Sequence, residues 1–265
     1  MGIAVALVVA PLMALAASLT VHAVAYARGA AAKRRARAAC PFDDDDHDTL
    51  PVARAAQLVA TESVLWLYAI LTAPIAPAED VAPAADPVPV VVFPPRWVPR
   101  SAVRVLVARL RADGHTVVCP RLGAWSRQAS RASLVDRALR STWERHGART
   151  VDVVAAAAAS PEVVEHLASG GSGTPVVRRL ITLGAAGAAG PRVPPATEVI
   201  ALYSQDDPLL GAVEQGRRPE AFNIALRGVG RLGFLHAPHV YGLVREQLTA
   251  PQTAALPAWP SPASS

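Results

Sequence analysis

The sequence has few of the residues from which metal centres, disulfides and nucleic-acid surfaces are built. Its 265 residues include 2 cysteines, and 5% of the chain is aromatic. Cys40 and Cys119 lie far apart, with no C-x-x-C pair and no histidine cluster, so the sequence indicates neither a zinc site nor a disulfide framework. The formal net charge is +5, but the arginines are dispersed and too few aromatic rings accompany them for a base-stacking surface. We therefore predict no metal, no cofactor and no nucleic-acid partner.

Apolar residues are abundant, since 52% of the chain is hydrophobic and only 18% is charged. A domain holds about 100–200 residues, so a chain of this length has room for one core and some appendages. We expect one globular domain at residues 89–250. The proline- and serine-rich residues 251–265 predict a disordered tail.

The N-terminal segment is apolar and is followed by basic residues. Residues 1–27 contain no Asp, Glu, Lys or Arg and are long enough to span a bilayer, so they predict a membrane anchor helix. The alternative is a secretory signal cleaved near residues 16–18, against which the absence of a basic start argues. The polar linker 28–49 begins with a basic cluster, and the positive-inside rule then places the domain in the cytoplasm.

Residues 50–72 predict a second helix, either amphipathic and membrane-interfacial or a lid-like flap. Arg54 and Glu62 shorten its apolar part to about 15 residues, below the ~20 that a membrane span requires. Trp66 and Tyr68 are expected at the membrane boundary. The alternative is that this segment forms a second membrane span.

If residues 59–76 span the membrane, the domain lies on the periplasmic or extracellular side.

Two polar stretches flank the second helix. The acidic run at 43–48 lacks the glycine and the later glutamate of a calcium loop, so we interpret it as a solvated joint. Residues 73–88 are rich in proline and alanine and predict an extended linker.

From residue 89 onward, short apolar runs alternate with amphipathic helical patterns. Strands are predicted at 88–93, 115–120, 150–154, 176–183, 198–203 and 222–226, and helices at 99–114, 130–146, 161–168 and 238–248. In the second of these helices, Val135, Leu139 and Trp143 are expected to face inward. This alternation predicts an α/β fold in which a mostly parallel sheet carries helices on both faces, preceded by N-terminal hydrophobic helices.

The chain is organised around residues 150–168. A buried strand leads through five alanines, 155–159, into a helix for which Ser160 is the expected N-cap and Pro161 the first residue. A strand, a tight turn of small residues and a helix are the arrangement of a nucleophile elbow. In this elbow, however, the turn contains no nucleophilic side chain.

Four segments resemble the bacterial triacylglycerol lipase and esterase branch of the α/β-hydrolases. VDVVAAAAAS at 151–160 resembles V-D-L-V-G-H-S-M-G-G, and RRLITLGAAGAAG at 178–190 resembles L-V-T-L-G-T-P-H-H-G-T. ALYSQDDPLL at 201–210 is similar to I-Y-S-x-x-D, which delivers the catalytic acid, and GVGRLGFLHAPHV at 228–240 to G-x-x-H-x-G-L-L. The resemblance covers about residues 89–248 and implies the α/β-hydrolase fold.

The same resemblance implies that most catalytic groups are missing. The serine nucleophile falls on Ala157, and the histidine base falls on Arg231, which stays protonated. The acid position keeps Asp207, which we expect to form an ion pair with Arg231. One oxyanion position falls on Pro95, which has no N–H, so only the N–H of Ala158 remains to donate.

Two alternatives concern the polar residues close to these positions. Asp206 is an alternative partner for Arg231. For a relocated catalytic set, Ser160, His236 and His239 are the candidates, although a cap explains the serine and the histidines lie on the wrong turn for the matched geometry.

Three functions are compatible with this pattern. The first is a membrane-associated pseudo-hydrolase that binds membrane lipid, an acyl ligand or a partner protein. The second is an active lipase or esterase with relocated catalytic residues. The third is a purely structural membrane protein whose pocket is filled by side chains. Random substitution in a duplicated hydrolase gene that is no longer under selection would leave the same sequence pattern as the first of these functions.

Overall fold

A computed structural model describes most of the predicted domain and parts of the N-terminal region. The described residues are 13, 15–24, 27–28, 30–31, 51–75, 77, 88–95, 98–121, 128–147, 150–170, 176–184, 191–207 and 217–251. The predicted joint at 43–48 lies outside them, as do most of the linker at 73–88 and of the tail at 251–265.

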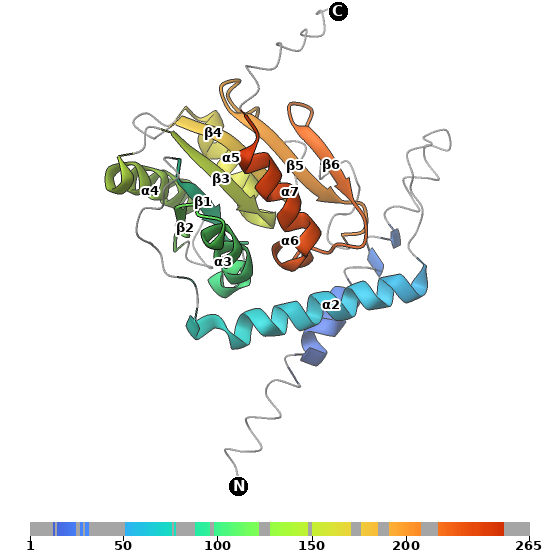
Figure 1. Ribbon diagram of the computed structural model, residues 1–265. Helices are drawn as coiled ribbons and strands as arrows, with labels where there is room; N and C mark the ends of the chain where they lie inside the picture. Colours follow the sequence, from blue (N-terminus) through green and yellow to red (C-terminus); the bar gives the residue numbers. More distant parts are fainter. Residues whose placement is uncertain are drawn as a thin grey trace, which may run out of the picture.

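Six parallel strands form one sheet with the order β2-β1-β3-β4-β5-β6 (Figure 1). The strands are β1 Val90–Phe93, β2 Val117–Val118, β3 Thr150–Ala156, β4 Val176–Leu183, β5 Glu198–Ser204 and β6 Phe222–Leu226. The chain starts in the interior of the sheet, adds β2 on one side of β1 and then places β3 on the other side. The strand order therefore reverses between β1 and β3, and ligand sites in such sheets lie at the carboxyl ends of the strands near a reversal of this kind.

Helices cover both faces of the sheet, as the sequence predicted. The helical segments of the described chain are α2 Val52–Leu71, η1 Ala73–Ile75, η2 Arg100–Val103, α3 Arg104–Ala112, α4 Gln128–His146, η3 Ala157–Ala159, α5 Ser160–Ala168, α6 Gly233–His236 and α7 Pro238–Thr249. One core lies between the sheet and α3, α6 and α7, and a second lies between the sheet and α4 and α5 (Figure 1). Strand β1 shows why both are needed, because Val90 and Val92 enter the first core whereas Val91 and Phe93 enter the second.

Most predicted elements are confirmed, with differences at their edges. β4 and β6 have the predicted bounds, whereas β2 is shorter and β3 is longer than expected. β3 continues because Ala155 pairs with Phe93 and Thr182, and Ala156 pairs with Leu183. The first two alanines of the predicted turn are therefore strand residues.

The inward orientation expected for Trp143 is wrong, because its side chain is 40% exposed. The buried face of α4 consists of Val135, Ala138, Leu139 and Thr142. Successive residues of a helix are about 100° apart, so Trp143 lies at the edge of that face.

A buried arginine connects the sheet to the end of the last helix. Arg179 on β4 is fully buried, and its Nε donates to Oε2 of Glu198 on β5 at 2.8 Å. Its other nitrogens donate to the carbonyl oxygens of Leu248 and Ala250, each at 3.2 Å. A buried guanidinium is tolerated only with such partners, so this contact holds the end of α7 on the sheet.

The second predicted helix, α2, packs on the domain and runs across the carboxyl-terminal edge of the sheet (Figure 1). Trp66 and Tyr68, which were expected at a membrane boundary, are half-buried on the domain side of the helix. Within the described part of the chain, no helix has both the length and the hydropathy needed to cross a membrane. The anchor predicted at 1–27 lies partly outside the described residues.

Candidate functional site

The residues that the resemblance predicts at catalytic positions all follow the carboxyl ends of strands. Pro95 follows β1, Ala157 and Ala158 follow β3, Asp207 follows β5 and Arg231 follows β6. Because the strands are parallel, these positions share one edge of the sheet. The candidate site therefore lies at the edge that α2 crosses.

Ala157 has an unusual backbone conformation. Its φ is 47°, and among the described residues it is the only non-glycine residue with a positive φ. It is buried and lies between the end of β3 and the rest of the η3 turn. The left-handed region costs an L-residue about 1–2 kcal/mol, so the surrounding strand and helix must hold the turn in place.

Ser160 is not the N-cap that the sequence predicted. Its dihedral angles are helical, with φ −61° and ψ −46°, and its hydroxyl donates to the carbonyl oxygen of Ala155 at 2.9 Å. An N-cap needs a non-helical backbone, but η3 runs directly into α5, so Ser160 is already inside the helical turn. Ser160 is 1% exposed, and its hydroxyl satisfies a carbonyl oxygen near the end of β3.

Ion pairing and hydrogen bonding join the loops after β5 and β6. Nε of Arg231 lies 3.4 Å from Oδ2 of the buried Asp207, so the expected ion pair is present. The alternative partner, Asp206, instead accepts a hydrogen bond from the backbone N–H of Gly228 at 2.6 Å. The two adjacent aspartates therefore bind two different positions of the following loop.

The two candidate histidines lie in different environments at the corner between α6 and α7. The ring of His236 packs edge-on against Tyr68 of α2, with centroids 5.7 Å apart. Burial, and then the charge of Arg109, lower the pKa of His236, which favours its neutral form. His239 is exposed and lines the groove beside α2.

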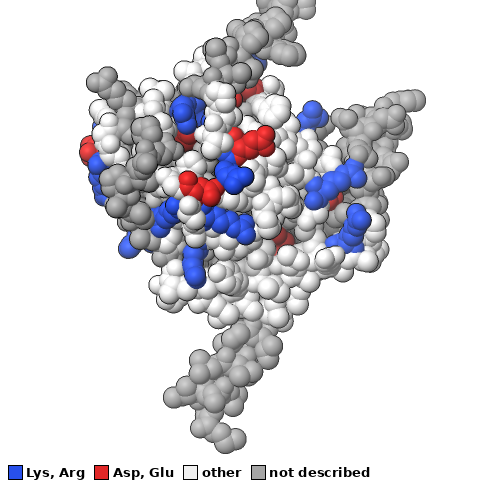
Figure 2. Space-filling view, viewed as in Figure 1, with Lys and Arg blue, Asp and Glu red and all other residues white. Residues whose placement is uncertain are grey.

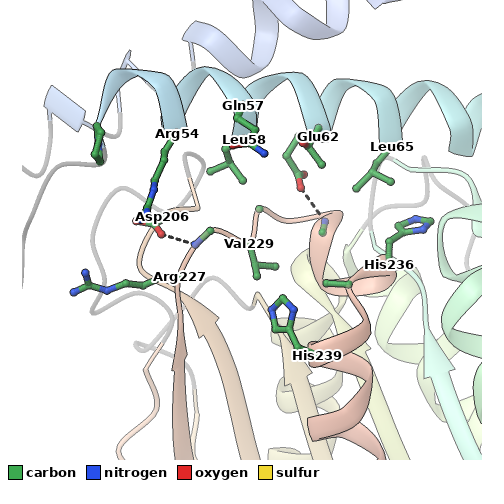
Figure 3. A pocket seen from close by; sticks show the side chains of 16 residues that line it. Arg54, Gln57, Leu58, Glu62, Leu65, Asp206, Arg227, Val229, His236 and His239 are labelled. Carbon is green, nitrogen blue, oxygen red and sulfur yellow. Dashed lines mark hydrogen bonds between the residues drawn. The ribbon is translucent and has the colours of Figure 1, made fainter.

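Glu62 is the residue of this edge that the sequence reasoning missed. Glu62 is 1% exposed, and its carboxylate accepts hydrogen bonds from the backbone N–H groups of Leu232 at 2.7 Å and Gly233 at 2.8 Å. Figure 3 shows the bond to Gly233. A Cβ at Gly230 would lie 2.4 Å from this carboxylate, so Glu62 can approach only because residue 230 is a glycine. The signal in the sequence was an acid inside an apolar helix, because a buried acid needs partners.

The charge state of Glu62 depends on pH near neutrality. Burial raises its pKa from 4.5 to about 7, while the N–H groups of Leu232 and Gly233 lower it in part. Asp207 raises the pKa further and Arg231 lowers it. Glu62 therefore belongs to the same electrostatic cluster as the Asp207–Arg231 pair.

A groove of about 670 Å³ lies between α2 and the loops after β5 and β6. It is lined by Pro51, Arg54, Gln57, Leu58, Thr61, Glu62, Leu65, Asp206, Arg227, Gly228, Val229, Gly230, Gly233, His236, Ala237 and His239. Leu58 and Val229 form apolar parts of the wall, and Arg54 extends from α2 toward Asp206 (Figure 3). Ala157 is not part of this lining, so the groove lies beside the elbow.

The backbone at Ala157 predicts an unequal response to glycine at two neighbouring alanines. Ala157→Gly loses a buried methyl but removes the left-handed strain, so we expect a free energy of unfolding within about 0.5 kcal/mol of wild type. Ala159→Gly loses an equally buried methyl at φ −78°, where glycine gives no relief, and should cost about 1–1.5 kcal/mol. Urea denaturation measures both, and equal losses would contradict the strained turn.

The burial of Glu62 predicts a pH-dependent stability. Its folded pKa, about 7, exceeds the unfolded value of 4.5, so its favourable contribution is complete below 4.5 and is lost as the pH rises through about 7. The wild-type free energy of unfolding should therefore fall between about pH 5 and pH 8, by about 3 kcal/mol at most, and Glu62→Gln should remove this component.

The exposed Glu246 provides the control for this titration. Glu246→Gln makes the same substitution on α7, outside the cluster of Glu62, Asp207 and Arg231, and should keep the wild-type pH slope in denaturant titrations. If the slope of Glu62→Gln also matches wild type, Glu62 does not titrate as its burial implies.

Comparison with known proteins supports the fold. No protein-family model and no curated protein matches the sequence. The product of the gene lin2722 from Listeria innocua superposes with a TM-score of 0.51 at 11% identity, over 63% of this chain and 96% of that chain. A protein of unknown function from Agrobacterium tumefaciens, named as a candidate α/β hydrolase, gives a TM-score of 0.50 at 12% identity, over 63% and 87%. With its parallel sheet, this chain therefore has an α/β-hydrolase-like fold with helices on both faces.

Proposed function

We propose that this protein is a catalytically inactive α/β-hydrolase homologue that binds a lipid, an acyl ligand or a partner protein. The observation that carries the proposal is Ala157, whose left-handed backbone lies at the turn between β3 and α5 but whose side chain is a methyl group. A methyl group cannot attack a carbonyl carbon, so an elbow of this shape has no nucleophile.

The neighbouring positions support the same conclusion. A guanidinium has no lone pair with which to act as a general base, and the ion pair of Arg231 with Asp207 occupies the acid that would otherwise orient a histidine. Pro95, which follows β1, has no N–H with which to stabilise an oxyanion. For hydrolysis, other residues would have to supply a nucleophile, a base and one oxyanion donor.

The alternative is an active ester hydrolase with relocated catalytic residues. Ser160 is the nearest hydroxyl after the elbow, but its buried side chain donates to the carbonyl oxygen of Ala155. To act as a nucleophile it would have to break this hydrogen bond and reach the surface. This geometry favours the non-catalytic proposal.

Reaction with a fluorophosphonate probe tests catalysis directly. We expect neither probe labelling nor hydrolysis of short- and medium-chain p-nitrophenyl esters by the full-length protein, because no activated serine is present. The inactive assignment is refuted by labelling that disappears in Ser160→Ala and persists in Ser169→Ala, a matched change at the end of α5. An active serine hydrolase provides the positive control for the probe.

The groove beside α2 is the proposed ligand site. Its apolar wall residues, including Leu58, Leu65 and Val229, suit an acyl chain, and Arg54 and Arg227 at its rim suit a polar head group. The volume of about 670 Å³ falls within the range of small-molecule sites, about 300–1,000 Å³.

Two neighbouring residues of α2 provide a matched test of the groove. Thr61 lines it, whereas Ala60 is exposed and is not part of the lining. A fluorescent fatty acid, followed by its emission below its micellar concentration, should bind at least about tenfold more weakly to Thr61→Trp than to wild type, and Ala60→Trp should bind as wild type does. If both variants bind the fatty acid equally well, the groove is not the ligand site. If wild type does not bind the fatty acid, the proposal is reduced to its other form, in which the protein binds a partner protein.

A further inference from the structure

Large hydrophobic side chains that face solvent are concentrated in the N-terminal helices. Among the described residues, eight of the eleven that are exposed lie within the first 75 positions. They are Met13, Leu19, Val21, Val24, Val52, Val64, Leu71 and Ile75. Exposed apolar surface gathered in this way marks an interaction site, whereas single exposed residues do not.

The exposed side of α2 is apolar along its length. Val52, Ala56, Ala60 and Val64 are exposed at successive intervals of four residues, and Leu71 continues the same side of the helix. Glu62 points to the opposite side, into the domain, and Arg54 extends toward the groove (Figure 3). Of the two charged residues of the helix, Glu62 is buried and the exposed Arg54 lies along the groove, so the side that carries Val64 and Leu71 is uncharged, unlike that of an ordinary surface helix.

The helical residues 15–24 extend this surface. Ser18 and His22 are their buried polar side chains, and Nδ1 of His22 lies 3.5 Å from Oγ of Ser63 on α2. The polar groups thus meet between the two segments, while Leu19, Val21 and Val24 remain exposed. The apolar side chains of both segments are therefore free to contact a partner.

Basic residues occur next to this surface. Arg28 is exposed beyond residues 15–24, and the partly exposed Arg104 begins α3 directly after η2, which packs against α2 and η1. Arg100 on η2 is not available to a partner in the same way, because its guanidinium donates to the carbonyl oxygen of Cys119 at 3.1 Å. In Figure 2 the lower part of the visible face carries no coloured residues, and Lys and Arg side chains lie above it. Among the described residues of 13–75, Glu62 is the only acid, and it is buried.

We propose that the outer sides of residues 15–24, α2 and η1 form a docking surface for an anionic lipid bilayer, with the helices lying in the plane of the interface. Apolar side chains that enter the acyl region and flanking arginines that meet lipid phosphates are the pattern of interfacial helices. A second copy of the chain fits less well, because the described residues of this surface offer no exposed carboxylate for the arginines of a partner.

This surface is separate from the proposed ligand groove. The groove uses Leu58, Thr61 and Glu62 on the domain side of α2, whereas the docking surface uses Val64 and Leu71 on the other side. Bilayer docking therefore does not depend on whether the groove binds a ligand or whether the elbow is inactive, and each can fail without the other.

Co-sedimentation of the full-length protein with vesicles tests the surface. Wild type should bind vesicles of phosphatidylcholine with phosphatidylglycerol at least about tenfold more tightly than vesicles of phosphatidylcholine alone, and high salt should reduce the difference. Val64→Asp combined with Leu71→Asp should weaken binding to the anionic vesicles at least about tenfold, because it places two carboxylates on the apolar side.

A matched substitution elsewhere distinguishes docking through this surface from non-specific hydrophobic adsorption. Val64 is 58% exposed and Val176, at the start of β4, is 55% exposed, so Val176→Asp should bind vesicles as wild type does. Both variants change exposed residues, and circular dichroism melting checks that they fold. The proposal is overturned if the Val64/Leu71 variant binds vesicles as well as wild type, which would assign binding to other residues of the chain. It is also overturned if wild type does not bind anionic vesicles, and dimers that this variant abolishes would then assign the surface to a second copy of the chain.

Discussion

The burial of the Glu62 carboxylate determines how helix α2 lies on the domain. Two backbone N–H groups, of Leu232 and Gly233, hold it, and Gly230 leaves the space that it occupies. Because this contact sets the rotation of α2 about its own axis, it also decides which side chains line the groove and which face solvent. The proposed ligand site and the proposed docking surface are the two sides of one helix whose orientation Glu62 sets.

The same contact links α2 to the edge where a hydrolase of this fold would carry its catalytic groups. Asp207 and Arg231 both influence the pKa of Glu62, so three charged groups from three segments form one cluster there. The left-handed turn at Ala157 lies at the same edge. In our proposal the shape of the elbow persists without its reaction, since packing of β3 and α5 can hold the turn whether or not residue 157 carries a hydroxyl.

Local patterns in the sequence predicted the order in which strands and helices follow one another along the chain, and the bounds of β4 and β6. They failed where tertiary contacts decide the outcome. Trp143 fits the helical period but lies at the edge of the buried face, and Ser160 follows a turn that is already helical and so cannot cap α5. Trp66 and Tyr68 contact the domain, which the sequence did not predict because an apolar helix packs equally well on a membrane or on its own domain.

The sequence by itself determined the fold class, because alternating apolar runs and amphipathic helices favour a parallel sheet with both faces covered. It also determined the absence of a hydroxyl in the five-alanine turn and placed Asp207 and Arg231 in segments that follow neighbouring strands. Only the tertiary structure decided that Asp207, not Asp206, pairs with Arg231, and that Glu62 is buried against residues 170 positions further along the chain. Contacts between segments so distant in the sequence leave no periodic pattern, because their geometry arises only when the sheet has brought the loops to one edge.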